Sequence, residues 1–208
     1  MNAQQPQINI AFSYLALGDS YTIGESVKEH ERWPNQLSDS LQAIGIKVEK
    51  PRIIAKTGWR TDQLQAATDT VIKKDWDFVS LLIGVNDFYQ NWPVQAFKPK
   101  FEKMLDSAIS FAGGDNKRVM VVSIPDYGYT PFGQANQEQI SKGLEEYNAT
   151  IESVCKIKEV AFTFITDISQ QGLNEPDLVA TDGLHPSGKQ YSLWAERIAA
   201  LSFFNQFN

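Results

Sequence analysis

Residues 12–24 read Phe-Ser-Tyr-Leu-Ala-Leu-Gly-Asp-Ser-Tyr-Thr-Ile-Gly, an apolar run that ends in a loop bounded by glycines. The run from Phe12 to Leu17 is short and nearly continuous, which is typical of a strand buried on both faces of a parallel sheet. Gly18 permits a tight turn after this strand and places Ser20 at its carboxyl end. Ligands of α/β proteins bind at that end, so Ser20 is a candidate site residue. A helix cap or a phosphate-binding loop would also use a serine here.

The rest of the chain alternates further apolar runs with helical patterns. Four more strands are predicted at Lys47 to Ala55, Phe78 to Ile83, Val119 to Ile124 and Ala161 to Ile165. Apolar residues spaced three and four apart predict helices within 97–111, 140–154 and 191–201, and we interpret these stripes as core packing. Strand and helix in alternation predict an α/β fold, a three-layer sandwich around a parallel sheet. We expect a single domain over 1–208, with residues 1–11 as a loose N-terminal segment.

Composition excludes several classes of protein. The formal net charge of −6 argues against nucleic acid as a partner, because phosphate backbones require clustered Lys and Arg. No apolar run approaches the roughly 18 residues of an integral membrane segment. Cys155 is the single cysteine, which rules out an internal disulfide and a thiolate metal cluster. The first lysine is Lys28, so the N-terminus lacks the basic start of a signal peptide. We therefore expect a cytoplasmic protein, or a periplasmic or secreted one if a signal peptide was removed.

The strongest local signal is Asp182-Gly183-Leu184-His185-Pro186-Ser187. An aspartate three residues before a histidine can contact one ring nitrogen within a turn, leaving the other nitrogen free to face a nucleophile. Pro186 favours an extended backbone at His185, and Ser187 can cap the helix that follows. A surface turn with a solvated histidine would have the same spacing. His30, the other histidine, lies in a charged run typical of a solvated loop.

Two more loops follow predicted strands. Gly58 has no side chain, so its backbone N–H can approach a ligand closely. Asn86, in Gly84-Val85-Asn86-Asp87, can direct its NH₂ group toward a developing oxyanion, although Gly and Asn are also common turn residues. For Asp19 and Asp87 we expect hydrogen bonding within loops rather than direct chemistry.

Together these four blocks resemble the SGNH hydrolases, also called GDSL lipases and esterases. The matching residues are Ser20 in Gly-Asp-Ser, Gly58, Asn86 in Gly-Val-Asn-Asp and His185 in Asp-Gly-Leu-His. The resemblance extends from about Tyr14 to Ile198. It implies a five-stranded parallel sheet with the flavodoxin-like strand order 2-1-3-4-5.

The resemblance also implies a mechanism without metal or organic cofactor. Ser20 would attack an ester carbonyl, His185 would act as the base, and Asp182 would orient His185. The backbone N–H groups of Ser20 and Gly58 and the side chain of Asn86 would form the oxyanion hole. We expect an esterase for small or medium acyl chains, with a small-molecule ester as partner. A carbohydrate O-acetyl esterase and a thioesterase are alternatives on the same residues.

Two hypotheses of other classes also remain open. A metal-dependent phosphoesterase would use Asp19, Asp87, Asp182 and His185 as ligands, but it leaves Ser20 and Asn86 without a role. A non-catalytic binding module would not need a general base beside a serine, so the presence of Ser, His and Asp together argues against it.

Aromatic residues are frequent after the predicted strands. Trp59, Phe88, Tyr89 and Tyr127 are candidates for substrate binding, either in an acyl pocket or against a sugar ring. Trp92, Tyr129 and Phe132 lie in the same predicted loops. Any one of these rings could instead cover an end of the core.

Overall fold

Five parallel strands form one sheet with the order β2-β1-β3-β4-β5. The computed structural model describes residues 11–69 and 75–207, so the expected N-terminal segment lies outside the described residues apart from Ala11. The strands are β1 (Tyr14–Gly18), β2 (Arg52–Ala55), β3 (Phe78–Leu82), β4 (Val119–Val122) and β5 (Ala161–Thr163). All four strand pairs are parallel, with Leu17 opposite both Ile54 and Leu81. The predicted fold class and the strand order implied by the resemblance are confirmed.

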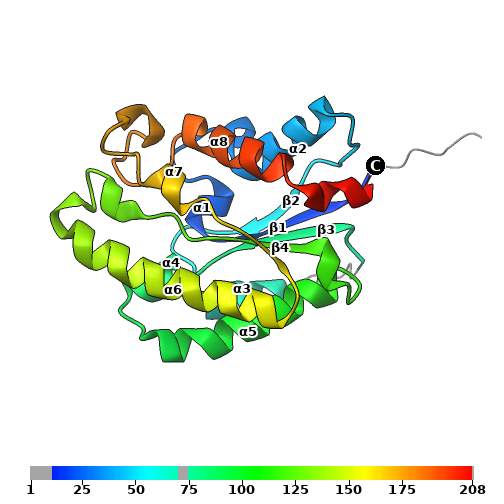
Figure 1. Ribbon diagram of the computed structural model, residues 1–208, viewed down its shortest axis with the longest axis horizontal. Helices are drawn as coiled ribbons and strands as arrows, with labels where there is room; N and C mark the ends of the chain where they lie inside the picture. Colours follow the sequence, from blue (N-terminus) through cyan, green and yellow to red (C-terminus); the bar gives the residue numbers. More distant parts are fainter. Residues whose placement is uncertain (1–10, 70–74, 208) are drawn as a thin grey trace, which may run out of the picture.

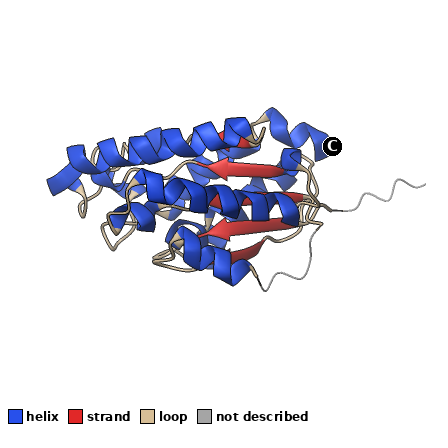
Figure 2. Cartoon of the chain, turned by 90° about the horizontal axis from the view of Figure 1, so that it is seen from below, coloured by secondary structure: helices blue, strands red, loops and turns tan. Residues whose placement is uncertain are grey.

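Helices cover both faces of this sheet and complete the three layers (Figure 1). The α-helices are α1 (Ser20–Ile23), α2 (Trp33–Ala43), α3 (Thr61–Thr68), α4 (Val85–Tyr89), α5 (Val94–Phe111), α6 (Gln137–Ile157), α7 (Thr166–Ser169) and α8 (Gly188–Ala199). Short 3-10 helices are η1 (Glu29–Glu31), η2 (Asn116–Arg118), η3 (Tyr127–Tyr129), η4 (Gln134–Asn136), η5 (Pro176–Leu178) and η6 (Ser202–Phe207). Helices α2 and α8 pack together on one face, and α3, α5 and α6 cover the other (Figure 1). Seen from below, the helices lie along the strands, which remain visible between them (Figure 2).

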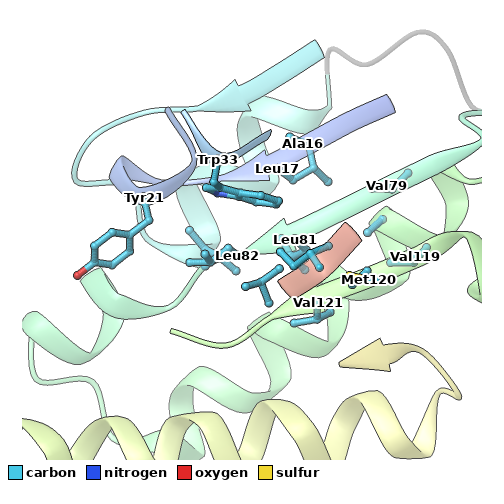
Figure 3. Close-up of a cluster of buried hydrophobic side chains, with 14 of the residues drawn as sticks. Ala16, Leu17, Tyr21, Trp33, Val79, Leu81, Leu82, Val119, Met120 and Val121 are labelled. Carbon is cyan, nitrogen blue, oxygen red and sulfur yellow. The ribbon is translucent and has the colours of Figure 1, made fainter. Parts of the chain in front are cut away.

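One hydrophobic core extends through both layers of helices and the sheet between them. Every residue of β1, β3 and β4 is buried, as expected for strands covered on both faces. Trp33 from α2 lies fully buried among side chains of these strands (Figure 3). Burying an aromatic side chain of this size contributes on the order of 2–3 kcal/mol. The core therefore fixes the strands whose carboxyl ends carry the candidate site residues.

The strands are shorter than the apolar runs predict, for local reasons. The predicted strand Lys47 to Ala55 begins only at Arg52, because Pro51 has no N–H to donate to a neighbouring strand. Val48 instead makes an isolated bridge with Phe12. The predicted strand Ala161 to Ile165 ends at Thr163, because Ile165 already starts helix α7 as its N-cap.

The two longer helices that were not predicted are α2 and α3. Helix α2 carries Trp33, Leu37 and Leu41 at a spacing of four, so its buried stripe is visible in the sequence. Helix α3 has a weaker stripe, with Leu64 as its one fully buried large apolar residue. Among the described residues, no helix combines the length and apolar character needed to cross a membrane.

Candidate active site

Ser20 is the first residue of α1 and lies directly beyond the end of β1. Gly18 makes the close turn possible, because a Cβ at this position would lie 2.6 Å from the carbonyl oxygen of Leu82. Asp19 is the N-cap of the helix, and its Oδ1 accepts a hydrogen bond of 3.0 Å from the N–H of Tyr21. Ser20 is therefore held by a capped turn and is itself largely buried.

His185 and Asp182 share one tightly bonded loop before α8. The Nδ1 atom of His185 lies 2.7 Å from Oδ2 of Asp182. The other carboxylate oxygen, Oδ1, accepts hydrogen bonds from the backbone N–H groups of Leu184 and His185 at 2.9 and 3.0 Å. The N–H of Ala180 closes the loop by donating to the carbonyl oxygen of His185 at 2.7 Å. This arrangement holds Nδ1 of the imidazole against the carboxylate and leaves Nε2 to face away from it.

The surroundings of Asp182 keep it ionised. Burial opposes the charged form, but hydrogen bonds from Ser26, from the His185 side chain and from the loop backbone together hold the pKa of Asp182 well below its usual range. The side chain of Asp182 is 31% exposed and that of His185 is 12% exposed. A permanent negative charge therefore lies beside a histidine that is mostly shielded from solvent, and it would stabilise an imidazolium.

Gly58 and Asn86 come from the loops after β2 and β3. Gly58 has a φ of +81° and occupies the third position of a turn that is closed by the N–H of Trp59 and the carbonyl oxygen of Lys56. A residue with a side chain is disfavoured in this conformation. The Nδ2 atom of Asn86 donates to the carbonyl oxygen of Trp59 at 3.0 Å. An amide nitrogen carries two hydrogens, so Asn86 keeps one donor for a ligand while this bond fixes its orientation.

A cavity of about 300 Å³ brings the four loops together. Its polar lining comes from Ser20, Thr57, Gly58, Asn86 and His185. Its apolar lining comes from Tyr21, Val85, Tyr89, Tyr127, Phe132 and Leu184. A larger groove of about 730 Å³ lies between α6 and the loops beyond β4 and β5, and it includes none of these polar residues. The smaller cavity is therefore the candidate active site.

The candidate substrate-binding aromatics divide into two groups. Tyr89 and Tyr127 line the cavity, together with Phe132, and the three ring centroids lie 6.4 Å from one another. Tyr89 is 57% exposed and Phe132 is 52% exposed, so these rings form a partly open wall. Phe88 and Trp59 do not line the cavity and pack against the core instead.

Asp19 and Asp87 are next in sequence to the cavity residues Ser20 and Asn86, and they form hydrogen bonds within the loops. Both are fully buried. The Oδ2 atom of Asp87 accepts hydrogen bonds from the N–H and the hydroxyl of Thr61, both at 3.0 Å, which ties the start of α3 to the loop after β3. Burial raises the pKa of Asp87, against these hydrogen bonds. Within 11–69 and 75–207, no group of three or more His, Cys, Asp and Glu side chains is placed to share a metal ion. His30 lies apart from the cavity, in a surface groove beside Glu29 and Asp39.

Two polar residues near this site, Ser26 and Thr57, were not predicted from the sequence. The hydroxyl of Ser26 donates a hydrogen bond of 2.6 Å to Oδ2 of Asp182, across 156 positions of the sequence. The hydroxyl of Thr57 donates to the carboxylate of Glu25. A serine and a threonine in polar loops carry no distinctive signal, and only the folded arrangement reveals their partners.

The fold and cavity define an α/β/α sandwich in which a serine, a histidine–aspartate pair and an asparagine meet at the carboxyl edge of the sheet. A model of the GDSL-like lipase/acylhydrolase family matches residues 16–193. The chain belongs to this family and is therefore a member of a hydrolase family, as the resemblance indicates.

Individual proteins resemble this chain over most of its length. The uncharacterized protein YpmR of Bacillus subtilis (strain 168) is 26% identical over 199 residues, covering 88% of this chain and 78% of YpmR. Among solved structures, the lipase Lip_vut3 from a goat rumen metagenome has a TM-score of 0.73 at 17% identity, covering 93% of this chain and 98% of its own. A variant of the acetyl xylan esterase Axe2 from Geobacillus stearothermophilus has a TM-score of 0.65 at 19% identity, covering 92% and 95%. At these identities the solved structures show the same fold.

Proposed function

We propose that this chain is a serine esterase that hydrolyses carboxylic esters of small or medium acyl groups through an acyl-enzyme at Ser20. The observation that carries this proposal is the convergence of Ser20, Gly58, Asn86 and His185 on one cavity, with Asp182 2.7 Å from the His185 ring. A serine hydroxyl is a weak nucleophile at neutral pH and requires an adjacent base. His185 is the one histidine that lines this cavity among the described residues.

In the first half of the reaction, Oγ of Ser20 bonds to the ester carbonyl carbon, and His185 takes the hydroxyl proton. The carbonyl oxygen becomes an oxyanion, which accepts hydrogen bonds from the N–H groups of Ser20 and Gly58 and from the Asn86 side chain. Collapse of this intermediate breaks the bond to the alcohol oxygen, and His185 returns the proton to the leaving alcohol. Asp182 stabilises the transient imidazolium.

In the second half, a water molecule takes the place of the alcohol. His185 accepts a proton from this water, and the resulting hydroxide attacks the acyl carbon. The bond to Oγ of Ser20 breaks, the serine recovers its proton from His185, and the carboxylic acid leaves. Both halves use the same oxyanion donors.

The cavity dimensions support a substrate of limited size. Its volume of about 300 Å³ corresponds to roughly ten water-sized groups, at about 30 Å³ for each. The apolar residues around Ser20, among them Val85 and Leu184, provide a surface for hydrocarbon. A short or medium acyl chain can be accommodated within this volume.

A second candidate is an O-acetyl esterase that acts on carbohydrate. The wall of Tyr89, Tyr127 and Phe132 favours it, because exposed rings beside a nucleophile can stack against a sugar ring. The two candidates share the same chemistry at Ser20 and differ only in the group held by the aromatic wall.

The test is an activity panel of p-nitrophenyl acetate, butyrate and octanoate, acetylated xylo-oligosaccharides and an acyl-CoA, with wild type and Ser20→Ala. We expect Ser20→Ala to lose on the order of 10⁵ to 10⁶ in kcat, because the nucleophile is absent. We also expect a fluorophosphonate probe to label Ser20, detected as a mass increase on the peptide that contains it. Near-normal turnover by Ser20→Ala would refute the mechanism, and an unlabelled wild type without activity would favour a binding module.

A further inference from the structure

We propose that Ser26 is a positioning residue for the proposed esterase reaction, holding the carboxylate of Asp182 in place against His185. This inference rests on the proposed function for its kinetic consequence. Its structural part, the control of the Asp182–His185 pair by a hydroxyl from another loop, can be measured without any substrate.

Oδ2 of Asp182 has two partners, from two different loops. This oxygen lies 2.7 Å from Nδ1 of His185 and accepts a hydrogen bond of 2.6 Å from the hydroxyl of Ser26. The other oxygen is bonded by backbone N–H groups of its own loop. Ser26 is thus the one described side chain from outside the loop that donates to this carboxylate. A charge-assisted hydrogen bond of this kind is stronger and more directional than one between neutral groups.

The backbone of Ser26 has an unusual conformation. Ser26 has a φ of +65°, in the left-handed region that residues with side chains seldom adopt. Such a conformation persists when its surroundings enforce it, and it is frequent at functional sites. In this conformation the side chain of Ser26 reaches Asp182, and no other side chain of residues 24–26 does so.

Hydrogen bonds on both sides of Ser26 hold its segment in place. The N–H groups of Gly24 and Glu25 both donate to the carbonyl oxygen of Ser20 at 3.0 Å. The carboxylate of Glu25 accepts a hydrogen bond from the hydroxyl of Thr57, in the loop that carries Gly58. The segment that contains Ser26 is therefore bonded to the nucleophile on one side and to the Gly58 loop on the other.

These contacts assign a specific task to the Ser26 hydroxyl. It links the loop of the nucleophile to the loop of the base, so that Ser20 and His185 keep their relative position. Loss of the hydroxyl leaves Asp182 held only by its own loop. We expect the imidazole to lose orientation while the core and the substrate-binding cavity are unchanged.

The experiment compares Ser26→Gly and Ser26→Ala with wild type. Both variants lose the hydrogen bond to Asp182, and glycine tolerates the left-handed backbone better than alanine, so Ser26→Ala should be less stable than Ser26→Gly. Both lack the hydroxyl, and both should lose roughly 10- to 100-fold in kcat with little change in KM, as expected for a small displacement of a catalytic group. The matched control is Glu159→Gly, which changes another non-glycine residue with positive φ, at +53°, after the end of α6. It should keep wild-type kcat.

The second readout is nuclear magnetic resonance of protein labelled with ¹⁵N-histidine. The chain contains only His30 and His185, so each imidazole can be assigned from a single substitution. We expect Ser26→Gly to shift the Nδ1 resonance of His185 and to leave that of His30 unchanged. Glu159→Gly should move neither.

Three results separate the possible outcomes. Wild-type kcat and an unmoved His185 resonance in Ser26→Gly would overturn the positioning role and leave the esterase proposal intact. Loss of kcat only in proportion to loss of folded protein would also overturn it. Full activity in Ser20→Ala would refute the proposed function, and a shifted His185 resonance in Ser26→Gly would then still support the positioning of the Asp182–His185 pair.

Discussion

Asp19 should make the folded protein less stable as the pH rises through neutrality, and Asp19→Asn should remove that effect. Asp19 is fully buried, and its Oδ2 has no hydrogen-bond partner among the described residues. Burial raises the pKa of Asp19 to about 8, the N–H of Tyr21 lowers it, and the nearby charge of Asp87 raises it further. Asparagine can keep the bond from Tyr21 through its own Oδ1 and carries no charge to bury.

The direction of the effect depends on which state holds the proton. Below about pH 4, Asp19 is protonated in both the folded and the unfolded chain and contributes no pH dependence. Between that pH and about 8, the folded state keeps a proton that the unfolded state has lost. The free energy of unfolding therefore falls as the pH rises, by at most about 1.4 kcal/mol for each pH unit. Integrated from pH 5 to pH 7.5, the contribution of Asp19 is about 3 kcal/mol.

The measurement is urea unfolding followed by tryptophan fluorescence at pH 5 and at pH 7.5. The free energy of unfolding of Asp19→Asn, taken relative to that of wild type, should be about 3 kcal/mol higher at pH 7.5 than at pH 5. Asp39→Asn is the matched control, because Asp39 lies exposed on α2. This substitution should leave the pH dependence of the free energy of unfolding as it is in wild type. Equal pH dependence in wild type and Asp19→Asn would refute the assignment of a protonated buried carboxyl group below the nucleophile.

Three further substitutions test the site and the packing behind it. Asn86→Ala should reduce kcat by about 10² to 10³ for p-nitrophenyl butyrate, since one oxyanion donor is lost, and a loss below three-fold would remove Asn86 from that role. Gly143→Ala should lower the free energy of unfolding in urea by about 1–3 kcal/mol, because the new Cβ would lie 2.2 Å from the Phe88 ring; unchanged stability would contradict this packing. Phe132→Ala should raise KM for p-nitrophenyl octanoate roughly three- to ten-fold, through about 1 kcal/mol of lost apolar contact. The same variant should change KM for the acetate little, and an equal effect on both esters would place Phe132 away from the acyl chain.

The sheet could be predicted from sequence because its strands are buried on both faces. Continuous apolar runs such as Phe78 to Leu82 distinguish such strands from half-exposed ones, whose side chains would alternate. The runs do not specify which strands are neighbours, so the order had to come from the family resemblance. Strand ends were less predictable, since they depend on single events such as the missing N–H of Pro51 and the early start of α7 at Ile165.

The candidate site was predictable where a residue type is required by the chemistry. Ser20, Asn86 and His185 belong to motifs that follow strands or precede the last helix, and the cavity unites them. Ser26 could not be found in this way, because no sequence rule places a serine in a left-handed conformation. The buried position of Asp19 was equally hidden, since an aspartate beside a serine is more often a solvated helix cap.

Hydrogen bonds join the loops of this site to one another in series. The geometry of the site therefore depends on these bonds as well as on the sheet. The loop after β3 is hydrogen-bonded to the loop after β2. The loop after β2 is hydrogen-bonded to the loop after β1, and the loop after β1 is hydrogen-bonded to the loop before α8. The contacts are Asn86 with Trp59, Asp87 with Thr61, Thr57 with Glu25, and Ser26 with Asp182. All four join side chains to groups in other loops, and none belongs to the sheet. Since the hydrophobic core fixes the strands independently of these bonds, substitutions in the series should lower kcat at a smaller cost in stability than substitutions in the core. The order of the loops also defines one hydrogen-bonded route from Thr57 to His185, which runs through Glu25, Ser26 and Asp182.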